Sequence, residues 1–401
     1  MEKKVYSSEI ERDIRSAVEN FEIVLREQVA RNQRMRAERE EKDVANKTGN
    51  LAPSSNRDKV IIGTAAGDGI GPIIMTEAEK VLKAVLRDRL TSGSLVLKPI
   101  EGFTLENRLA AGKTVPDSVM AAMSECDVLL KGPTTTPNAA MNTANIESAN
   151  VYLRKSFDLF ANVRPVSIPE EGIDWTFFRE NTEGEYALGS KGEYITGELA
   201  VDFKVTTDEG TERIARAAYE YARANGKKRV SIVTKANIMK KTDGNFLNIC
   251  REVAKDYPEI ETDSWFIDIM AANLVNKEIR SNFQVFVLPN LYGDIITDEA
   301  AQIQGGVGTA GSANIGRNYA IFEAIHGSAP RMIEDGLGEY ANPSSLLKAA
   351  VMMLSHVGYR DESKRLEDAL EAADKELGPR MTGMAGGATC REYAELVMSR
   401  L

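Results

Sequence analysis

Two aspartates lie four residues apart in the segment LPNLYGDIITDEA, which spans residues 288–300. On a helix, the carboxylates of Asp294 and Asp298 would leave the same face one turn apart, where their like charges repel each other. Such a pair persists when a cation lies between the carboxylates or when solvent screens them. Because neighbours such as Ile295 and Ile296 look buried, a divalent metal ion explains the pair better than an exposed acidic face.

A third carboxylate, Asp268, lies in the apolar segment WFIDIMAANLV and could complete this metal site. The chain contains only two histidines, so a histidine-rich transition-metal site is not expected. The expected ligand is therefore a hard cation held by carboxylate oxygens.

Three arginines occur among apolar residues, namely Arg154 in VYLR, Arg164 in FANVRPV and Arg179 in FFRE. A buried guanidinium needs an anionic partner, and its planar fork matches a carboxylate. The three together indicate a site for a polyanion, although each one alone could belong to an ordinary structural ion pair. Lys235 follows the strand-like run RVSIVT. A lysine partly removed from water there is a candidate proton carrier, but its position alone does not assign that role.

The elements that must hold these residues alternate between strands and helices after residue 58, which is the pattern of an α/β protein. We expect strands at 59–65, 94–100, 128–131, 175–179, 230–234 and 285–289, and helices at 208–225, 242–256, 344–357 and 362–375. The segment GDGIGP at 67–72 lacks the G-x-G-x-x-G spacing of a dinucleotide-binding Rossmann turn. We therefore expect a tight turn there, with Pro72 at the start of a helix.

The N-terminal segment is a separate unit. Residues 7–43 predict a helix that Ser7 or Ser8 could cap, and residues 46–57 have the composition of a linker. The apolar stripe of the helix consists of Ile10, Ile14, Val18, Phe21, Leu25 and Val29. The helix docks on a partner subunit or on the body of the chain, or else it is a solvated tail.

Composition limits the classes of partner. The net charge of −10 argues against nucleic acid and anionic membranes, and no apolar run is long enough to span a membrane. The 401 residues are enough for about two or three domains. The three cysteines lie far apart and are expected as small buried hydrophobic residues, which suits a cytoplasmic location.

A series of motifs in a fixed order identifies a family. They are GDGIGP at 67–72, LKGPTTTP at 130–137, S-x-N-x-x-x-R at 148–154, FANVRP at 160–165, FRENTEGEY at 178–186, KAN at 235–237, NLYGDIITDEAA at 290–301 and EAIHGSAP at 323–330. Over roughly residues 58–401 the chain resembles the β-decarboxylating dehydrogenases, the family of isocitrate, 3-isopropylmalate and homoisocitrate dehydrogenases.

The resemblance implies an α/β fold of two domains that is not a Rossmann fold. The large domain would comprise residues 58–159 and 305–401, and the small domain residues 160–304 with a clasp segment. Residues 1–57 would be an added helical extension and linker. Subunits of this family share their active sites, so a homodimer or higher homo-oligomer is expected.

The resemblance also implies roles for the residues. The ligands of Mg²⁺ or Mn²⁺ would be Asp294, Asp298 and, from the partner, Asp268. The malate core of the substrate would be held by Arg154, Arg164 and Arg179. Lys235, also contributed across the dimer, would take part in deprotonating the hydroxyl as hydride leaves for the nicotinamide. After CO₂ is lost, Tyr186 would protonate the enolate.

Substrate choice depends on the group attached to C3 of malate. Isopropylmalate enzymes present apolar side chains where this chain has Ser148 and Asn150, and Lys131 adds a positive charge. A site built to bond a polar group rejects an apolar analogue. The expected substrate is therefore the tricarboxylate isocitrate, with 3-isopropylmalate, homoisocitrate and tartrate as alternatives. The loop at 138–147 is longer than is common in the family, so the presentation of Ser148 does not follow from the sequence.

The cofactor is NAD or NADP. The adenine-binding loop of the family matches His326, Gly327, Ala329 and Asn342, and the nicotinamide end matches Thr135, Thr136 and Glu323. Arg331 stands where NAD-dependent relatives have an acid, and an arginine could pair with the 2′-phosphate of NADP. The C-terminal segment lacks the tyrosine and arginine that grip this phosphate in many NADP-using bacterial relatives, so NAD is favoured.

An alternative of a different class is a non-catalytic regulatory subunit of a hetero-oligomeric isocitrate dehydrogenase. Such subunits keep the fold but lose metal ligands or the lysine–tyrosine pair. Both Lys235 and Tyr186 are present here, together with the three aspartates, so we expect an enzyme.

Overall fold

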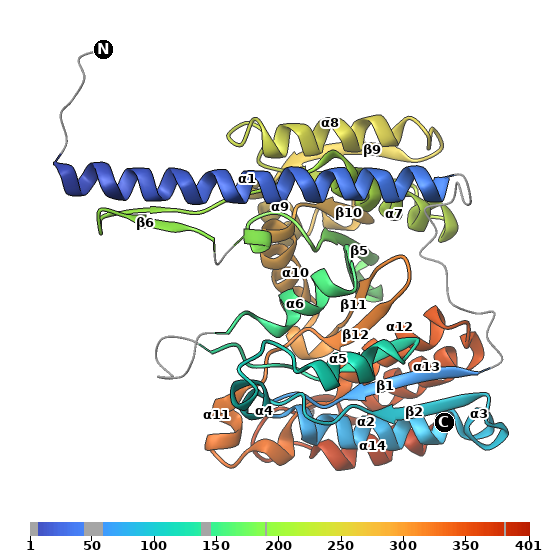
Figure 1. Cartoon of the computed structure of the whole chain (residues 1–401). Coiled ribbons are helices and arrows are strands. Elements are labelled where there is room, and N and C mark those ends of the chain that lie inside the picture. Colours follow the sequence, from blue (N-terminus) through green and yellow to red (C-terminus); the bar gives the residue numbers. More distant parts are fainter. Residues whose placement is uncertain (1–6, 44–58, 138–145, 189–190, 381) are drawn as a thin grey trace.

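A mixed β-sheet of ten strands runs through the whole computed structural model, which describes residues 7–43, 59–137, 146–188, 191–380 and 382–401 (Figure 1). Its strands are β1 (Val60–Ala65), β2 (Leu95–Pro99), β3 (Val128–Lys131), β4 (Ala161–Ile168), β5 (Ile173–Glu180), β8 (Arg229–Thr234), β9 (Glu261–Phe266), β10 (Val285–Leu288), β11 (Gly311–Ile315) and β12 (Ala320–Ala324). A separate antiparallel hairpin pairs β6 (Glu193–Ile195) with β7 (Leu199–Val201).

The strand order is β2-β1-β3-β12-β11-β4-β5-β10-β8-β9. The pairs β12–β11, β11–β4 and β4–β5 are antiparallel, and the pairs on either side of them are parallel. Parallel strands that are covered on both faces read as continuous apolar runs, and β3 (VLLK) and β10 (VFVL) are buried along their whole length. The sheet therefore joins two parallel halves through an antiparallel centre.

Fourteen described α-helices surround the sheet. They are α1 (Ser8–Asp43), α2 (Gly71–Val85), α3 (Arg87–Ser92), α4 (Leu105–Ala110), α5 (Asp117–Ser124), α6 (Ala149–Ser156), α7 (Asp208–Ala224), α8 (Thr242–Ala254), α9 (Ile267–Val275), α10 (Asn290–Gln304), α11 (Pro330–Glu334), α12 (Ser344–His356), α13 (Arg360–Leu377) and α14 (Cys390–Met398). The predicted α/β class is confirmed, and each predicted strand and helix lies within two residues of an observed one. Among the described residues, no helix combines the length and the apolarity needed to cross a membrane.

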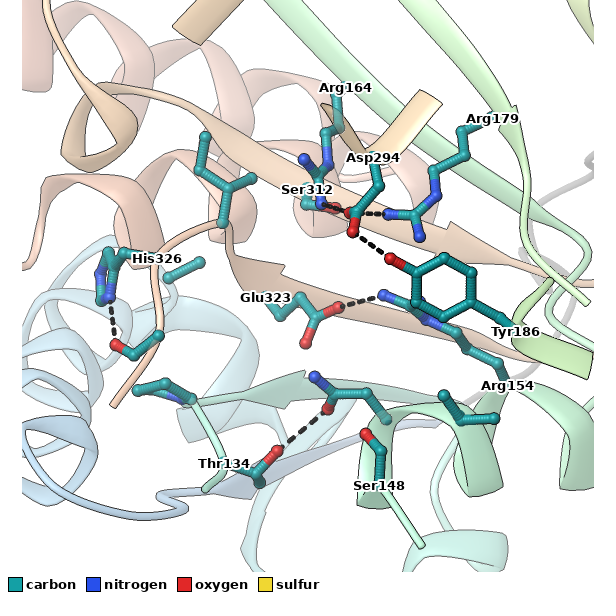
Figure 2. Close-up of a pocket in the computed structure, with 16 residues that line it drawn as sticks. Thr134, Ser148, Arg154, Arg164, Arg179, Tyr186, Asp294, Ser312, Glu323 and His326 are labelled. Carbon is teal, nitrogen blue, oxygen red and sulfur yellow. Dashed lines mark hydrogen bonds and ion pairs between the residues drawn. The ribbon is translucent and has the colours of Figure 1, made fainter. Parts of the chain in front are cut away.

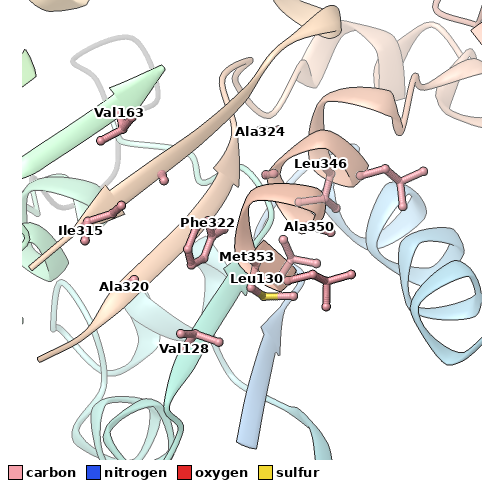
Figure 3. Close-up of a cluster of buried hydrophobic side chains, with 14 of the residues drawn as sticks. Val128, Leu130, Val163, Ile315, Ala320, Phe322, Ala324, Leu346, Ala350 and Met353 are labelled. Atoms are coloured by element: carbon pink, nitrogen blue, oxygen red, sulfur yellow. The ribbon is translucent and has the colours of Figure 1, made fainter. Parts of the chain in front are cut away.

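The core is divided by the two faces of the sheet. One face carries a single hydrophobic cluster, in which α12 packs on β3, β11 and β12 (Figure 3). The opposite face carries two separate clusters, one around Phe103 and Met123 and one around Trp175 and Phe286. Alternation along β10 shows this division, because Val285 and Val287 belong to the first cluster whereas Phe286 belongs to the last. The candidate site lies on the second face.

The turn after β1 packs closely against two other loops. Gly67 and Gly69 have φ angles of 74° and 59°. A Cβ at Gly67 would lie 2.1 Å from the carbonyl oxygen of Pro133, and a Cβ at Gly69 would lie 1.9 Å from that of Ser328. The predicted tight turn is confirmed, with Pro72 in the first turn of α2.

Helix α1 docks on the chain's own body, where it contacts α7 and β6. The Ser7 hydroxyl accepts from the backbone N–H of Ile10 at 3.3 Å, so the predicted cap is present. The docking face, however, matches the predicted apolar stripe only in part, because Phe21 of the stripe packs edge-to-face on Phe203 but most of the stripe is exposed. Ala17 and Val24 are 3% and 1% exposed, whereas Val18 and Leu25, which belong to that stripe, are 57% and 61% exposed.

Other sequence expectations have simple outcomes. Cys126, Cys250 and Cys390 are buried free thiols, as predicted. The linker at 46–57 and most of the loop at 138–147 lie outside the described residues. The boundaries between a large and a small domain stay a prediction, because the sheet runs unbroken across both.

Candidate active site

A cavity of about 220 Å³ opens among α6, α10 and the central strands of the sheet (Figure 2). The predicted site residues that line it are Ser148, Asn150, Arg154, Arg164, Arg179, Tyr186, Asp294, Glu323, His326 and Gly327. One cavity thus gathers most of the predicted substrate residues, a predicted metal ligand and part of the predicted cofactor loop.

Helix α10 places the carboxylates of Asp294 and Asp298 against two arginines. Arg164 donates from Nη1 to Oδ1 of Asp298 at 2.9 Å, and its Nη2 lies 3.7 Å from Oδ1 of Asp294. Arg179 donates from Nη1 to the same Oδ1 of Asp294. Burial opposes ionisation of Asp294, but the charges of the three arginines and the hydrogen bond from Tyr186 together hold the pKa of this carboxyl below its usual value. Asp294 is therefore an anion at neutral pH, the form that binds a cation.

The surroundings of this pair follow the prediction in part. Ile296 is buried, as expected, but Ile295 is 62% exposed. The reason is the helical period, because residue 295 lies on the outer side of α10 while 296 faces the core.

The three predicted arginines converge from three elements. Arg164 and Arg179 lie on the adjacent strands β4 and β5, and Arg154 lies on α6. All three side chains are buried. Burial, together with the nearby charge of Arg154, lowers the pKa of Arg179 to about 9. Arg164 and Arg179 pair with Asp298 and Asp294, and Arg154 lies near Glu323, so the polyanion site stays a prediction.

Glu323 and Lys131 form a buried ion pair behind this cluster. The Nζ of Lys131 lies 2.8 Å from Oε2 of Glu323, and Nη2 of Arg154 lies 3.7 Å from Oε1. Burial opposes ionisation of Glu323, but Lys131 and Arg154 outweigh it and hold its pKa at about 2. Lys131 is not among the residues that line the cavity. Its charge, expected to contact the substrate, neutralises Glu323 instead.

Tyr186 presents a protonated phenol to the cavity. Its hydroxyl donates to Oδ2 of Asp294 at 2.5 Å (Figure 2). Burial raises the pKa of Tyr186, and the hydrogen bond to Asp294 raises it further. At neutral pH the phenol therefore holds a proton that it can deliver to a substrate atom.

Lys235 and Asp268 lie apart from this cavity. The lysine follows β8 and the aspartate begins α9, and neither lines the cavity. The Nζ of Lys235 donates to Oδ1 of Asp268 at 2.5 Å. Among the described residues, no three acidic, histidine or cysteine side chains cluster closely enough to hold a metal ion. The three predicted metal ligands are thus not brought together within one chain.

The start of α6 presents the two polar residues predicted to select the substrate. Ser148 precedes the helix, and Asn150 lies in its first turn. Both line the cavity, and Oδ1 of Asn150 accepts from the hydroxyl of Thr134 at 3.1 Å. This hydrogen bond fixes Asn150 and leaves its amide N–H groups for a ligand oxygen.

The predicted cofactor residues lie on two loops that meet. The hydroxyls of Thr135 and Ser328 are 2.7 Å apart, which ties the loop after β3 to the loop after β12. The remaining predicted cofactor residues of these loops and of α11 are Thr136, His326, Gly327, Ala329 and Arg331, and Asn342 lies just before α12. Burial lowers the pKa of His326, so its ring is neutral at physiological pH. Arg331 is exposed in the first turn of α11.

Sequence reasoning missed two residues that position this machinery. The Oδ1 of Asn290 accepts from Nε and Nη2 of Arg179 at 3.0 and 2.7 Å, and its Nδ2 donates to the carbonyl of Glu183 at 3.0 Å. Asp68 accepts from the backbone N–H of Thr135 at 2.8 Å. A signal for Asn290 was present, because it precedes Asp294 by four residues and so shares its helix face.

Comparison with known proteins agrees with this geometry. The sequence model described as isocitrate/isopropylmalate dehydrogenase matches residues 61–397. The chain belongs to the isocitrate/isopropylmalate dehydrogenase family. Within it, the mitochondrial NAD isocitrate dehydrogenase subunit 2 of Schizosaccharomyces pombe is 38% identical over 343 residues, which cover 84% of this chain and 86% of that protein. A mitochondrial NAD isocitrate dehydrogenase regulatory subunit of Dictyostelium discoideum is 38% identical over 342 residues, which cover 84% of this chain and 90% of that protein.

A solved family member shows the same fold. The crystal structure of isocitrate dehydrogenase from Methylococcus capsulatus superimposes with a TM-score of 0.75 at 35% sequence identity. The match covers 85% of this chain and 99% of that one. The predicted fold is therefore confirmed, and helix α1 lies outside the segment that the family model matches.

Proposed function

We propose that this family member oxidises isocitrate and releases CO₂, forming 2-oxoglutarate with reduction of NAD. The observation that carries the proposal is the single cavity in which Arg154, Arg164 and Arg179 face Ser148 and Asn150. Three arginines suit three carboxylates, and the two polar side chains suit a substituent that accepts hydrogen bonds. The relatives named as NAD isocitrate dehydrogenase subunits support the same substrate and cofactor.

The donor set fits a hard divalent cation. Asp294 and Asp298 offer carboxylate oxygens one helical turn apart, and Asp294 keeps its charge at neutral pH. These two residues would hold Mg²⁺ or Mn²⁺, and the third protein ligand would be the partner subunit's Asp268. When bound, the ion would draw negative charge from the substrate oxygens, and NAD would accept the hydride.

The chain's own residues supply orientation and protons. Arg154, Arg164 and Arg179 hold the substrate carboxylates. Lys235 of the partner subunit takes part in removing the hydroxyl proton as the hydride leaves the same carbon. The resulting β-keto acid loses CO₂, and Tyr186 gives its proton to the enolate carbon.

A second copy of the chain completes the site in this proposal. The Lys235–Asp268 pair lies at the surface, outside the cavity that contains Asp294. Around the pair, the apolar side chains of Ile238, Phe266 and Ile269 are exposed, as an association surface requires. We infer a homodimer, or a higher homo-oligomer built from it, in which each cavity receives the pair of the neighbouring subunit.

The alternative, a regulatory subunit, is supported by the Dictyostelium relative, whose name describes it as a regulatory subunit. Against it stands the state of the cavity, because Tyr186, Asp294 and the arginines are all present and face one another. The cytoplasmic location stays a prediction, and the two relatives compared above carry the word mitochondrial in their names.

The test is nicotinamide reduction by the purified full-length chain with Mg²⁺. Isocitrate should be compared with 3-isopropylmalate, homoisocitrate and tartrate, each with NAD and with NADP. We expect metal-dependent reduction with isocitrate and NAD. Activity only on an apolar-substituted malate would contradict the role of Ser148 and Asn150, and inactivity on all four substrates would favour the regulatory role.

A further inference from the structure

A second cavity lies where helix α1 meets the body of the chain, and it too has a volume of about 220 Å³. Its charged lining residues are Arg31 and Arg34 from α1, Asp158 after α6, Glu209 and Arg213 from α7, and Arg317 from the turn between β11 and β12. The candidate active site uses none of these six residues.

The lining of this cavity is positively charged although the chain as a whole carries a net charge of −10. Its four arginines exceed its two acids. The ion pairs of these arginines are Arg213 with Asp158 at 2.9 Å, Arg317 with Glu209 at 3.5 Å and Arg31 with Glu183 at 3.1 Å. In the part of the chain that the structure describes, Arg34 forms no ion pair. The excess of guanidinium groups attracts an anion.

Arg213 gives the cavity a rigid wall. Its side chain is buried, with Nη1 donating to both carboxylate oxygens of Asp158 at 2.9 Å and Nη2 donating to the hydroxyl of Thr182 at 2.8 Å. The remaining donor, Nε, is buried without a hydrogen-bond partner. Asp158 has a φ of 47°, a conformation that residues other than glycine rarely adopt. Because Nε has almost no accessible surface, it belongs to the packed side of this wall, and a ligand would meet the outer part of the guanidinium.

We propose that this cavity is a second anion site, which binds a small multivalent oxyanion carrying carboxylate or phosphate groups. Guanidinium groups match both kinds of oxyanion with paired N–H donors. The cavity has the same volume as the one proposed above to hold isocitrate, so, resting on that proposed function, an anion of the size of a tricarboxylate suits it. Arg34 and Arg317 are the exposed arginines of the lining, and Arg213 is its buried arginine.

The site depends on the N-terminal helix. Arg31 and Arg34 belong to α1, which precedes the segment 61–397 that the family model matches. A ligand held between α1, α7 and the β11–β12 turn would bridge the added helix to the body. Arg31 also contacts Glu183, which lies three residues before Tyr186, so the bridge reaches the segment that carries the proposed proton donor.

Calorimetric titration of the full-length protein tests the proposal, with citrate and inorganic pyrophosphate as separate probes. Either probe can also bind in the candidate active site. The variant Arg154→Gln should weaken that binding event and so distinguishes it from binding at the second cavity. The cavity variants are Arg34→Gln, which breaks no described ion pair, and the double variant Arg34→Gln/Arg317→Gln. The matched control is Arg26→Gln, because Arg26 lies exposed on the same helix and pairs with Glu22 away from the cavity.

We expect a binding event that Arg154→Gln leaves in place and that the double variant weakens about tenfold or more. Arg34→Gln should weaken it less, and Arg26→Gln should not change it. Weakening for citrate alone assigns the site to polycarboxylates, and weakening for pyrophosphate alone assigns it to phosphates. If every binding event disappears in Arg154→Gln, or if the double variant binds both probes as the unaltered protein does, the proposal is wrong.

Discussion

The ammonium group of Lys235 and the carboxylate of Asp268 are bonded to each other at 2.5 Å, outside the cavity that contains Asp294. The hydrogen bond from Lys235 holds the pKa of Asp268 below its usual value, so this carboxylate is charged at neutral pH. A proposed base and a proposed metal ligand therefore lie together on one surface and would enter a neighbouring cavity together.

Mixing two inactive variants tests whether sites are shared between subunits. Asp294→Asn and Asp268→Asn should each lack metal-dependent turnover when purified alone, while both keep their fold. In a mixed dimer, one of the two sites would combine an intact Asp294 with an intact Asp268. Random assortment by co-expression should then restore about one quarter of the unaltered activity. A mixture that stays inactive would place both aspartates in the same subunit's site.

The phenol of Tyr186 should be needed for turnover but not for folding. Tyr186→Phe removes the proton that burial and Asp294 keep on the oxygen, and loss of a general acid lowers kcat by about 10²–10⁴-fold. Tyr194→Phe is the matched control, because Tyr194 is an exposed tyrosine on β6. Steady-state rates with isocitrate would show the difference. Unchanged turnover of Tyr186→Phe would mean that another group donates the proton.

Asn290 should act through Arg179. Asn290→Ala removes the oxygen that accepts two N–H groups of Arg179, so the guanidinium loses its orientation toward the substrate. We expect KM for isocitrate to rise about tenfold with a smaller change in kcat, and stability to fall by about 1–3 kcal/mol. Asn290→Asp keeps the acceptor and should recover most of the affinity. Equal loss in both variants would contradict a positioning role.

The elements that could be predicted from the sequence are those whose apolar pattern is continuous. Strands β3 and β10 and helices α7 and α12 match their expected positions because burial on both faces, or on one helix face, leaves a periodic signal. Strand β11 (GSANI) has no such signal, since its polar residues Ser312 and Asn314 are buried. They are satisfied by Asn162, about 150 residues earlier in the chain.

In the candidate site, too, the sequence predicted the residues but not the contacts between distant strands. Residue type identified the arginines, Tyr186 and the aspartates as functional, and the cavity brings most of them together. Residue type did not reveal that Lys131 neutralises Glu323, because strand register creates that pair when β3 and β12 place the two residues side by side. Pairing of distant strands is a tertiary property, which no local pattern contains.

The half-buried ring of His356 should make the fold sensitive to acid. Burial lowers its pKa to about 4, below the ordinary value of 6.5. Between these values the unfolded chain binds more protons than the folded one, so stability falls as the pH drops from about 6.5 toward 4. His356→Gln should remove about 1–2 kcal/mol of this loss between pH 7.5 and pH 5. Urea midpoints at the two pH values measure it, and an unchanged difference would rule out His356 as the cause.

Arg331 should affect only the phosphorylated cofactor. It is exposed in the first turn of α11, where the sequence suggested contact with a 2′-phosphate. Arg331→Gln should leave kcat/KM for NAD within about twofold and lower any activity with NADP about tenfold. Rates with both nucleotides at fixed isocitrate would decide this, and a loss with NAD would show that Arg331 contacts a group that the two cofactors share.

The unbroken sheet has a mechanical consequence. Strands β11, β4 and β5 connect the two parallel halves by hydrogen bonds along their length, so no loop hinge separates the regions that carry α6 and α10. Closure of the cavity around a ligand must then be a torsion of these central strands. The twist between neighbouring strands ranges over roughly 10–35° among known sheets, so the central strands have room for such a change.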